Sequence, residues 1–386
     1  MMKINRVSKE LANYLAYVQL MSSLEPGEGN ITGSIVNAGL RDIIDFYQNS
    51  NSKELKATGP RLIKALEPMV NHYRTIAPLK VQFETITNDF NALCASNQEL
   101  YSYGIEYQWL DERMDCSKMG LPDDLPWHAR IGLRHHSGLV AIEEEFLLRD
   151  AFYLLESAED SYRNLNAYGD EISKSGQERN PTGLKDLRLI NFDVAANSRL
   201  CVVTFFSFIE AFVNSVGYDF SLRNRNNLAL AQLEILNGMK KGRFLSLEYK
   251  IEKYPSIIRI DKHSPIVISD PAQLREPFKS FVENIKTIRD SSMHYAPIKE
   301  AIWKKPLEWL EDARSASRLC IEVAREFWHS CYPLREQPKY LGELNYDKHI
   351  SIAKERIKVR YEAMTIIKNR QADAEKIGRA SCRERV

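Results

Sequence analysis

The residues of this chain that are best suited to chemistry are an arginine and a histidine near position 290. Arg289 and His294 are separated by four residues, at the end of a segment whose apolar residues recur at helical spacing. Cleavage of a phosphodiester bond by its own 2′-hydroxyl needs a group that transfers protons near neutral pH and a fixed cation for the phosphate oxygens. Histidine can supply the first and arginine the second. The pair is a candidate site for metal-free RNA cleavage, although this spacing is also common among solvated surface residues.

Asp290 could support the histidine. It lies four residues before His294, which places the two on one face if the helix continues. We therefore expect Asp290 to orient the imidazole and raise its pKa, with simple solvent exposure as the alternative. Arg289 and His294 differ by about 140° around a straight helix, so they do not share a face. A cleft, a helix break or a symmetry-related copy must bring them together.

A second pair of polar residues interrupts the most apolar part of the chain. The segment 193–220 is strongly apolar but contains Glu210 and Asn214, which share one helix face because they are four residues apart. Two polar groups on a buried helix need partners. They either support the candidate site or hydrogen-bond to neighbouring helix ends.

The elements that must position these residues are predicted to be helical throughout, so the fold class is all-α. Apolar residues recur at spacings of three and four, and clusters of Pro, Gly, Asn and Asp mark the loops. We predict helices over about 7–23, 33–48, 60–74, 79–94, 138–173, 193–220, 246–253, 277–294, 306–328 and 346–375. The short apolar runs 257–260 and 265–268 could form a small β excursion or an ordered loop.

The length of 386 residues favours two domains. Ser, Gly, Gln, Asn and Pro crowd the segment 173–184, which we interpret as the linker. We therefore predict a helical N-terminal domain of unknown role over 1–185, a helical bundle over 186–336 and a C-terminal helical extension over 337–376. The N-terminal domain would sense a trigger or restrain the candidate site.

The last ten residues, 377–386, resemble the translation of a common sequencing adapter. We expect this tail to lie outside the natural sequence. It carries Arg379, Arg383 and Arg385 against Glu384, a net charge of +2, so the chain's +1 becomes −1 without it. Global charge therefore does not favour non-specific nucleic-acid binding, and any RNA-binding surface would be local.

Composition indicates a soluble globular protein of the cytoplasm. The hydrophobic fraction is 44%, there is no continuous apolar run of about 18 residues, and the N-terminus lacks the pattern of a signal peptide. The six cysteines are scattered and form no CxxC pair, which favours buried, reduced thiols over disulfides or zinc. His128, His135 and His136 lie near three glutamates, but neither their spacing nor an HExxH motif predicts a metal site. We expect no metal and no cofactor.

The order of these features resembles the HEPN superfamily of small all-α bundles, over about residues 191–333. Members carry an Arg, four to six residues and a His, often with a polar residue directly after the Arg, as Arg289, Asp290 and His294 do here. The apolar helix with an embedded Glu and Asn, 208–214, and the segment 246–250 before a Pro are also similar to HEPN sequences.

The resemblance implies a metal-independent endoribonuclease that acts as a homodimer, with two Arg and two His in one groove. His294 would act as general acid or base, Arg289 would bind phosphate and Asp290 would orient the imidazole, with Glu210, Asn214 and Tyr295 in support. The resemblance also implies RNA as substrate, with tRNA or mRNA cleavage in phage defence or a toxin–antitoxin pair, an antitoxin or activator protein as partner, and no membrane. Some HEPN toxins have a modifiable Tyr two residues after the His, whereas here Tyr295 follows at once and position 296 is Ala.

Two other functions stay open from the residues alone. The protein could be a non-catalytic HEPN-like module that binds nucleotides or proteins, which its near-neutral charge favours. It could also be a helical scaffold in which His294 caps a helix end.

Overall fold

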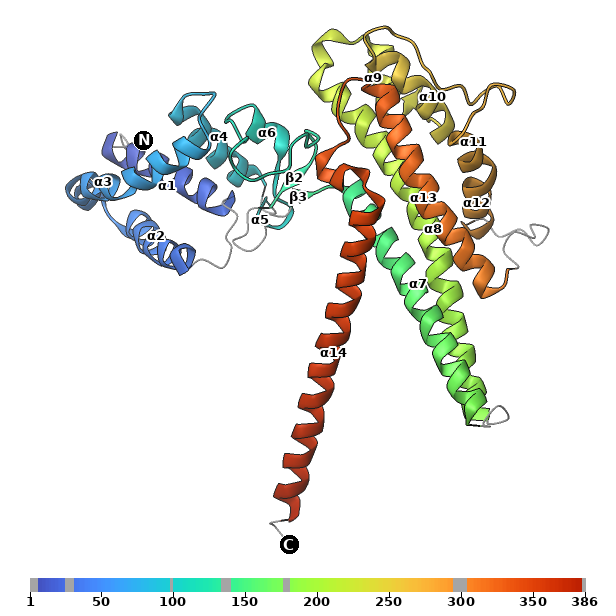
Figure 1. Cartoon of the computed structure of the whole chain (residues 1–386). Coiled ribbons are helices and arrows are strands. Elements are labelled where there is room, and N and C mark those ends of the chain that lie inside the picture. Colours follow the sequence, from blue (N-terminus) through green and yellow to red (C-terminus); the bar gives the residue numbers. More distant parts are fainter. Residues whose placement is uncertain are drawn as a thin grey trace. The chain divides into compact units, whose positions relative to one another are not determined.

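The expected all-α class is confirmed, because 75% of the chain is helical and each strand has only two residues. The computed structural model describes residues 6–24, 31–97, 100–132, 140–175, 181–293 and 304–383. For some of these residues near helix ends, only the backbone is described. The chain divides into two compact units, Met1–Ile142 and Glu143–Val386 (Figure 1).

Unit 1 is built from helices and a small sheet. Helix α1 supplies Leu11, Leu15 and Val18 to its core and packs against α3 and α4. Its helices are α1 (Arg6–Leu24), α2 (Ile31–Asn49), α3 (Ser52–Ile76), α4 (Phe83–Ser96), α5 (Leu100–Tyr103) and α6 (Tyr107–Asp111). Strands β1 (Ile105–Glu106), β2 (Arg130–Ile131) and β3 (Val140–Ala141) form an antiparallel sheet in that order, with Ile105 opposite Ile131 and Arg130 opposite Ala141.

Helix α3 begins eight residues before the predicted start at position 60. The side chain of Asn51 accepts hydrogen bonds from the backbone N–H groups of Lys53 and Glu54, at 3.0 and 3.1 Å. The Glu54 carboxylate in turn accepts from the backbone N–H of Asn51 at 2.8 Å. This capping box satisfies donors that the first turn would otherwise leave unpaired, so the polar stretch starts a helix and does not break one.

Unit 2 is a helical bundle in which α7, α8 and α13 lie side by side (Figure 1), and the first part of α14 contacts α7. Its α-helices are α7 (Glu143–Lys174), α8 (Pro181–Arg223), α9 (Leu230–Leu236), α10 (Leu247–Ile258), α11 (Phe278–Ser280), α12 (Thr287–Met293), α13 (Pro306–Cys331) and α14 (Tyr346–Arg383). A π-helical segment, η2 (Phe281–Lys286), joins α11 to α12, and a 3₁₀ segment, η4 (Lys339–Leu344), precedes α14. Strands β4 (Met239–Lys240) and β5 (Arg243–Phe244) form a hairpin. No strand forms at 257–260 or 265–268.

Helix α7 belongs to unit 2, whereas the sequence analysis grouped it with residues 1–185. Leu148, Phe152 and Leu155 on α7 are buried in the same core cluster as Phe205 on α8. The rings of Phe152 and Phe205 meet edge to face at 5.1 Å. The apolar face of α7 packs against α8 across the segment 173–184, and the contacts within the chain divide it between residues 142 and 143.

Helix α8 is long and apolar enough to cross a membrane by length and composition. However, 61% of its most apolar window is buried inside the fold, as a core helix would be. Phe208, Phe212 and Val213 are fully buried among the other helices of unit 2. The composition of α8 is therefore only weak support for a membrane location.

Most cysteines among the described residues are buried, as the sequence predicts. Cys116, Cys201, Cys320 and Cys331 are buried thiols, and Cys94 is half-buried. Burial raises the pKa of the Cys116 thiol to about 12, so that thiol is protonated at neutral pH.

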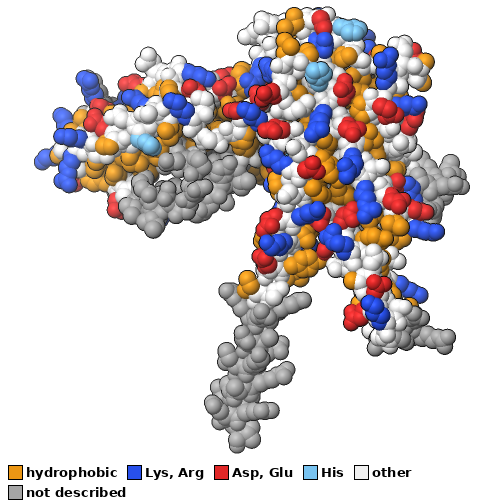
Figure 2. Space-filling view, viewed as in Figure 1, with side chains coloured by type: hydrophobic (Ala, Val, Ile, Leu, Met, Phe, Trp, Pro, Cys, Tyr) orange, Lys and Arg blue, Asp and Glu red, His pale blue; other side chains and the backbone are white. Residues whose placement is uncertain are grey.

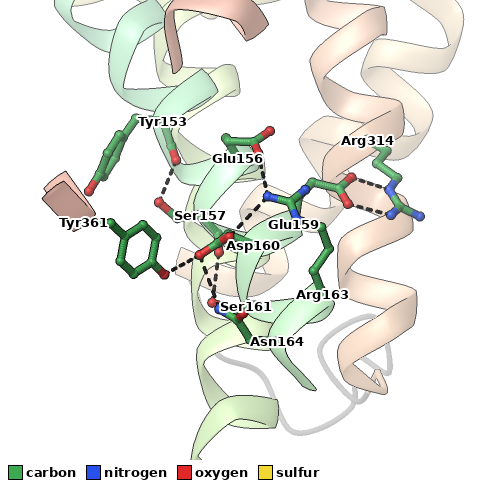
Figure 3. Close-up of polar contacts among 10 residues, drawn as sticks. All are labelled: Tyr153, Glu156, Ser157, Glu159, Asp160, Ser161, Arg163, Asn164, Arg314 and Tyr361. Carbon is green, nitrogen blue, oxygen red and sulfur yellow. Dashed lines mark hydrogen bonds and ion pairs between the residues drawn. The ribbon is translucent and has the colours of Figure 1, made fainter. Parts of the chain in front are cut away.

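The polar face of α7 links it to two neighbouring helices (Figure 3). Arg314 on α13 donates two hydrogen bonds to the Glu159 carboxylate, at 2.6 and 2.7 Å. On the other side, the Tyr361 hydroxyl of α14 donates to Asp160 at 2.5 Å. These contacts fix the rotation of α7 between α13 and α14.

A buried carboxyl group joins three elements of unit 2. Glu144 on α7 is 1% exposed, and it accepts hydrogen bonds from the hydroxyls of Ser215 on α8 and Tyr340 on η4, at 2.5 and 3.0 Å. Burial raises its pKa to about 7, against the lowering effect of these hydrogen bonds. The fold therefore favours the neutral carboxyl group.

We predict that Glu144 makes the stability of this protein depend on pH. Because its pKa is raised in the fold, its contribution is fully present below about pH 4.5 and is lost as pH rises through about 7. The loss would amount to about 3 kcal/mol. Urea unfolding at a series of pH values should show this decline in wild type and a flatter profile in Glu144→Gln. The control is Glu143→Gln, because Glu143 is the exposed neighbour. If Glu144→Gln and Glu143→Gln showed the same dependence of stability on pH, the prediction would be contradicted.

Candidate functional site

Two of the candidate site residues, Glu210 and Arg289, line an open groove in unit 2 with a volume of about 720 Å³. The groove is formed by α8, η2, α12, the first half of α10 and the loop after α10. It is lined by Phe206, Glu210, Ser246, Leu247, Glu248, Tyr249, Glu252, Lys253, Ile268, Ser269, Lys286 and Arg289.

Arg289 lies at the edge of this groove with its guanidinium held from two sides. The guanidinium carbon stands 4.6 Å from the centre of the Phe206 ring, a cation–π distance. Its Nη1 donates to Asp290 Oδ1 at 2.8 Å, and its Nη2 lies 3.9 Å from Glu210 Oε2. The side chain is 28% exposed, so the cation is positioned by protein groups and still reachable from solvent.

The π-helical segment η2 directly precedes α12, the helix that carries Arg289. Phe281, its first residue, stacks on Phe206 with ring centres 5.6 Å apart and planes 4° from parallel. This stack fixes the ring on which the Arg289 guanidinium rests. Wide turns of this kind occur often at functional sites. Between Arg289 and Met293 the helix is regular, so the described part contains no break that would turn Arg289 toward His294.

Asp290 faces cations of its own helix and of η2. It receives the hydrogen bond from Arg289 and lies 3.9 Å from Lys286 Nζ. Lys286 also pairs with Glu248 on α10 at 2.6 Å. Burial alone would raise the pKa of Glu248, but the hydrogen bonds to its carboxylate and the charge of Lys286 together outweigh burial, and the pKa is lowered. The ionised carboxylates thus neutralise the cations of the groove.

Glu210 and Asn214 share a face of α8, as the spacing predicts, and have different partners. Glu210 lies beside Arg289, whereas Asn214 Oδ1 accepts a hydrogen bond from Lys250 Nζ on α10 at 2.9 Å. Lys250 is 6% exposed, and burial lowers its pKa. Asn214 therefore accepts a hydrogen bond from a buried lysine, and its partner is not the backbone of a helix end.

His294 and Tyr295 lie outside the described residues. The structure thus brings together Arg289, Asp290 and Glu210 from the predicted set, with Asn214 one helical turn beyond. In the described part of the chain, no group of three or more His, Cys, Asp and Glu side chains is arranged to hold a metal ion.

Several residues that line the groove were not predicted from the sequence, among them Phe206, Lys286 and Lys253. Two of these three carry a detectable signal. Phe206 precedes Glu210 by four residues, and Lys286 precedes Asp290 by four, so each shares a helix face with a predicted site residue. Nothing in the local pattern of Lys253 marks it.

No protein-family model matches this chain, and searches of curated proteins and of solved structures found no match.

We predict that Asn214 is required because it satisfies Lys250. In Asn214→Leu the buried ammonium loses its acceptor, and the free energy of unfolding should fall by about 1–3 kcal/mol. In the double variant Asn214→Leu/Lys250→Met both partners become apolar, and most of the loss should be recovered. Denaturant unfolding of the four proteins of this cycle measures the coupling, and additive effects would show that the hydrogen bond contributes nothing.

Proposed function

We propose that this protein is a metal-independent endoribonuclease of the HEPN type that forms a homodimer. The observation that carries the proposal is the Arg289 guanidinium, positioned over Phe206 at the edge of an open groove. It belongs to the same short motif as His294.

The proposed cleavage needs two proton transfers, and histidine side chains can perform both. The 2′-hydroxyl oxygen attacks the adjacent phosphorus while a His294 imidazole takes its proton. The bond to the 5′-oxygen breaks, and an imidazolium donates a proton to that oxygen. The products are a 2′,3′-cyclic phosphate and a 5′-hydroxyl. Two copies of the motif in one groove would supply one imidazole for each transfer.

Arg289 would stabilise the charge that develops on the phosphate oxygens. Its planar guanidinium can donate two parallel hydrogen bonds to a phosphate, a geometry that lysine lacks. In the free protein these donors face Asp290 and Glu210. A bound phosphate would compete with these carboxylates for Arg289.

Single-stranded or loop RNA is the substrate class that fits this chemistry. In-line attack by the 2′-hydroxyl needs a backbone that can leave A-form geometry. Cleavage of tRNA or mRNA in phage defence or in a toxin–antitoxin pair is the proposed setting, in the cytoplasm. An antitoxin or activator protein would control the activity.

An apolar stripe on α8 supports a homodimer. Leu189, Phe192 and Leu200 follow one another at helical spacing and are 56%, 66% and 51% exposed. Phe192 precedes Phe206 by fourteen residues, or two heptads, so both lie on nearly the same side of α8. A second copy bound to this stripe would lie along the face of α8 that carries Phe206, the ring on which the Arg289 guanidinium rests.

One observation favours a second candidate function, a non-catalytic HEPN-like module that binds nucleotides or proteins. The groove cations are paired with carboxylates, Arg289 with Asp290 and Lys286 with Glu248. A balanced groove binds anions less strongly than a cationic one. Loss of dimerisation alone in Arg289 and His294 variants would fit this candidate.

We predict that cleavage requires both residues of the motif. Purified full-length protein incubated with total cellular RNA in EDTA should produce 2′,3′-cyclic phosphate ends. Arg289→Ala and His294→Ala should each reduce the rate by 100-fold or more, on the order of the effect of a lost acid–base group or charge-stabilising donor. Arg289→Lys should be nearly as damaging, because the bidentate geometry is lost.

The folded state of each variant is verified by circular dichroism. Asp290→Ala separates the two roles of that carboxylate, since a loss of rate indicates support of His294 and a gain indicates competition with phosphate. Cleavage of DNA, or equal cleavage by wild type and His294→Ala, would contradict the mechanism.

We predict that a charge on the apolar stripe prevents dimerisation. Phe192→Glu should shift the protein from dimer to monomer in size-exclusion chromatography with light scattering, because the carboxylate would be desolvated at the interface. Lys354→Glu, an exposed change on α14, is the matched control. A monomeric wild type, or a dimeric Phe192→Glu, would exclude this interface.

A further inference from the structure

The hairpin formed by β4 and β5 projects three basic side chains and an aromatic ring into solvent. Lys240, Lys241, Arg243 and Phe244 are all exposed, and the Phe244 side chain is 87% exposed. The turn consists of Lys241 and Gly242, with φ of 49° and 75°. Positive φ at both positions defines a tight two-residue turn that matches the twist of the strands. The turn residue Lys241 therefore stands at the very tip.

The charges of this hairpin are not neutralised. Among the described residues, Lys241 and Arg243 take part in no ion pair, and the one polar contact of the Lys240 ammonium is with the Tyr249 hydroxyl at 3.3 Å. This contrasts with the groove, where Lys286 pairs with Glu248. It also contrasts with the mixture of Lys, Arg, Asp and Glu over the face seen in Figure 2. The hairpin is a local cationic surface on a nearly neutral chain.

The hairpin is continuous with the groove of Arg289. Helix α10 starts three residues after Phe244, and its first turn lines the groove. Tyr249 belongs to both surfaces, because it lines the groove and its ring lies 5.4 Å from Lys240 Nζ. On the groove side, Lys253 Nζ lies 6.0 Å from the same ring. A series of cations and aromatic rings therefore leads from the hairpin tip into the groove.

We propose that this hairpin binds single-stranded RNA and directs the strand into the groove. Lys241 and Arg243 would contact phosphates, and Phe244 would stack on a base. Alternating cations and exposed aromatic rings suit a single strand, since the cations follow its backbone and every base offers a face for stacking. The inference rests on the proposed ribonuclease function and assigns that enzyme a substrate-binding element outside the Arg289–His294 motif.

Binding can be separated from cleavage with a 2′-O-methyl RNA oligonucleotide, which lacks the attacking hydroxyl. The hairpin variants are Lys241→Asn/Arg243→Gln and Phe244→Ala. Asparagine tolerates positive φ, so the first variant removes charge and keeps the turn. The control is Lys354→Gln/Lys358→Gln, which removes two exposed charges from α14. Fluorescence anisotropy of the full-length proteins at several salt concentrations gives the affinity and its salt dependence.

We expect the double charge variant to bind roughly 25-fold more weakly at about 0.1 M salt, with a salt slope smaller by about 1.4, as two lost phosphate contacts require. Phe244→Ala should bind about 10-fold more weakly with an unchanged slope. The control should bind like wild type. Wild-type affinity in the hairpin variants, or no RNA binding by wild type, would overturn the inference and leave the hairpin as a surface for a protein partner.

Parallel cleavage assays on unmodified RNA distinguish this inference from the proposed function. If cleavage depends on Arg289 and His294, but the hairpin variants cleave and bind RNA as wild type does, the hairpin inference is overturned and the nuclease function is kept. Hairpin-dependent binding with no cleavage by any protein supports the hairpin inference and overturns the nuclease function.

Discussion

The architecture of unit 2 depends on the burial of the central part of α8. Phe205, Phe208 and Phe212 are fully buried on one face of the helix, where Phe205 meets Phe152 of α7 and Phe212 meets Phe327 of α13. Burial of such rings is worth several kcal/mol each, so the three long helices are held in fixed register. Phe206 comes from the same run of residues and is aimed at η2. One helix, α8, therefore supplies both the core of unit 2 and the Phe206 ring that contacts Arg289.

The groove shows how a cation can be placed without a strongly basic protein. Arg289 and Lys286 come from one short stretch of chain, and their carboxylate partners Asp290, Glu210 and Glu248 come from three elements. The ion pairs fix the positions of the side chains while leaving the net charge of the groove near zero. On the β4–β5 hairpin, by contrast, Lys241 and Arg243 have no ion-pair partner among the described residues. The groove thus holds its cations in fixed positions, whereas the unpaired cations that could attract an anion lie on the hairpin.

Much of the fold was predictable because helical periodicity is a local property. The helices around 7–23, 306–328 and 346–375 were predicted within a few residues at their starts. The start of α3 was missed because the capping box of Asn51 resembles a loop in composition. The placement of α7 was missed because its partner lies across a polar segment, and packing across such a segment is not encoded locally. In the site, Glu210 and Asn214 were predictable from their polarity in an apolar run, whereas Lys253 and the Lys250–Asn214 bond depend on tertiary packing.

The pairing of Arg289 with Asp290 also bears on which anions the groove can retain. A small anion such as free phosphate must displace a carboxylate that is covalently tethered beside the guanidinium and therefore present at high effective concentration. A polymer held by a second surface has the same advantage of tethering, because its phosphates are already confined near the groove. If the hairpin holds RNA as proposed, the groove would favour the phosphates of a long chain over free nucleotides, and that preference for polymer length would arise from a single intramolecular ion pair.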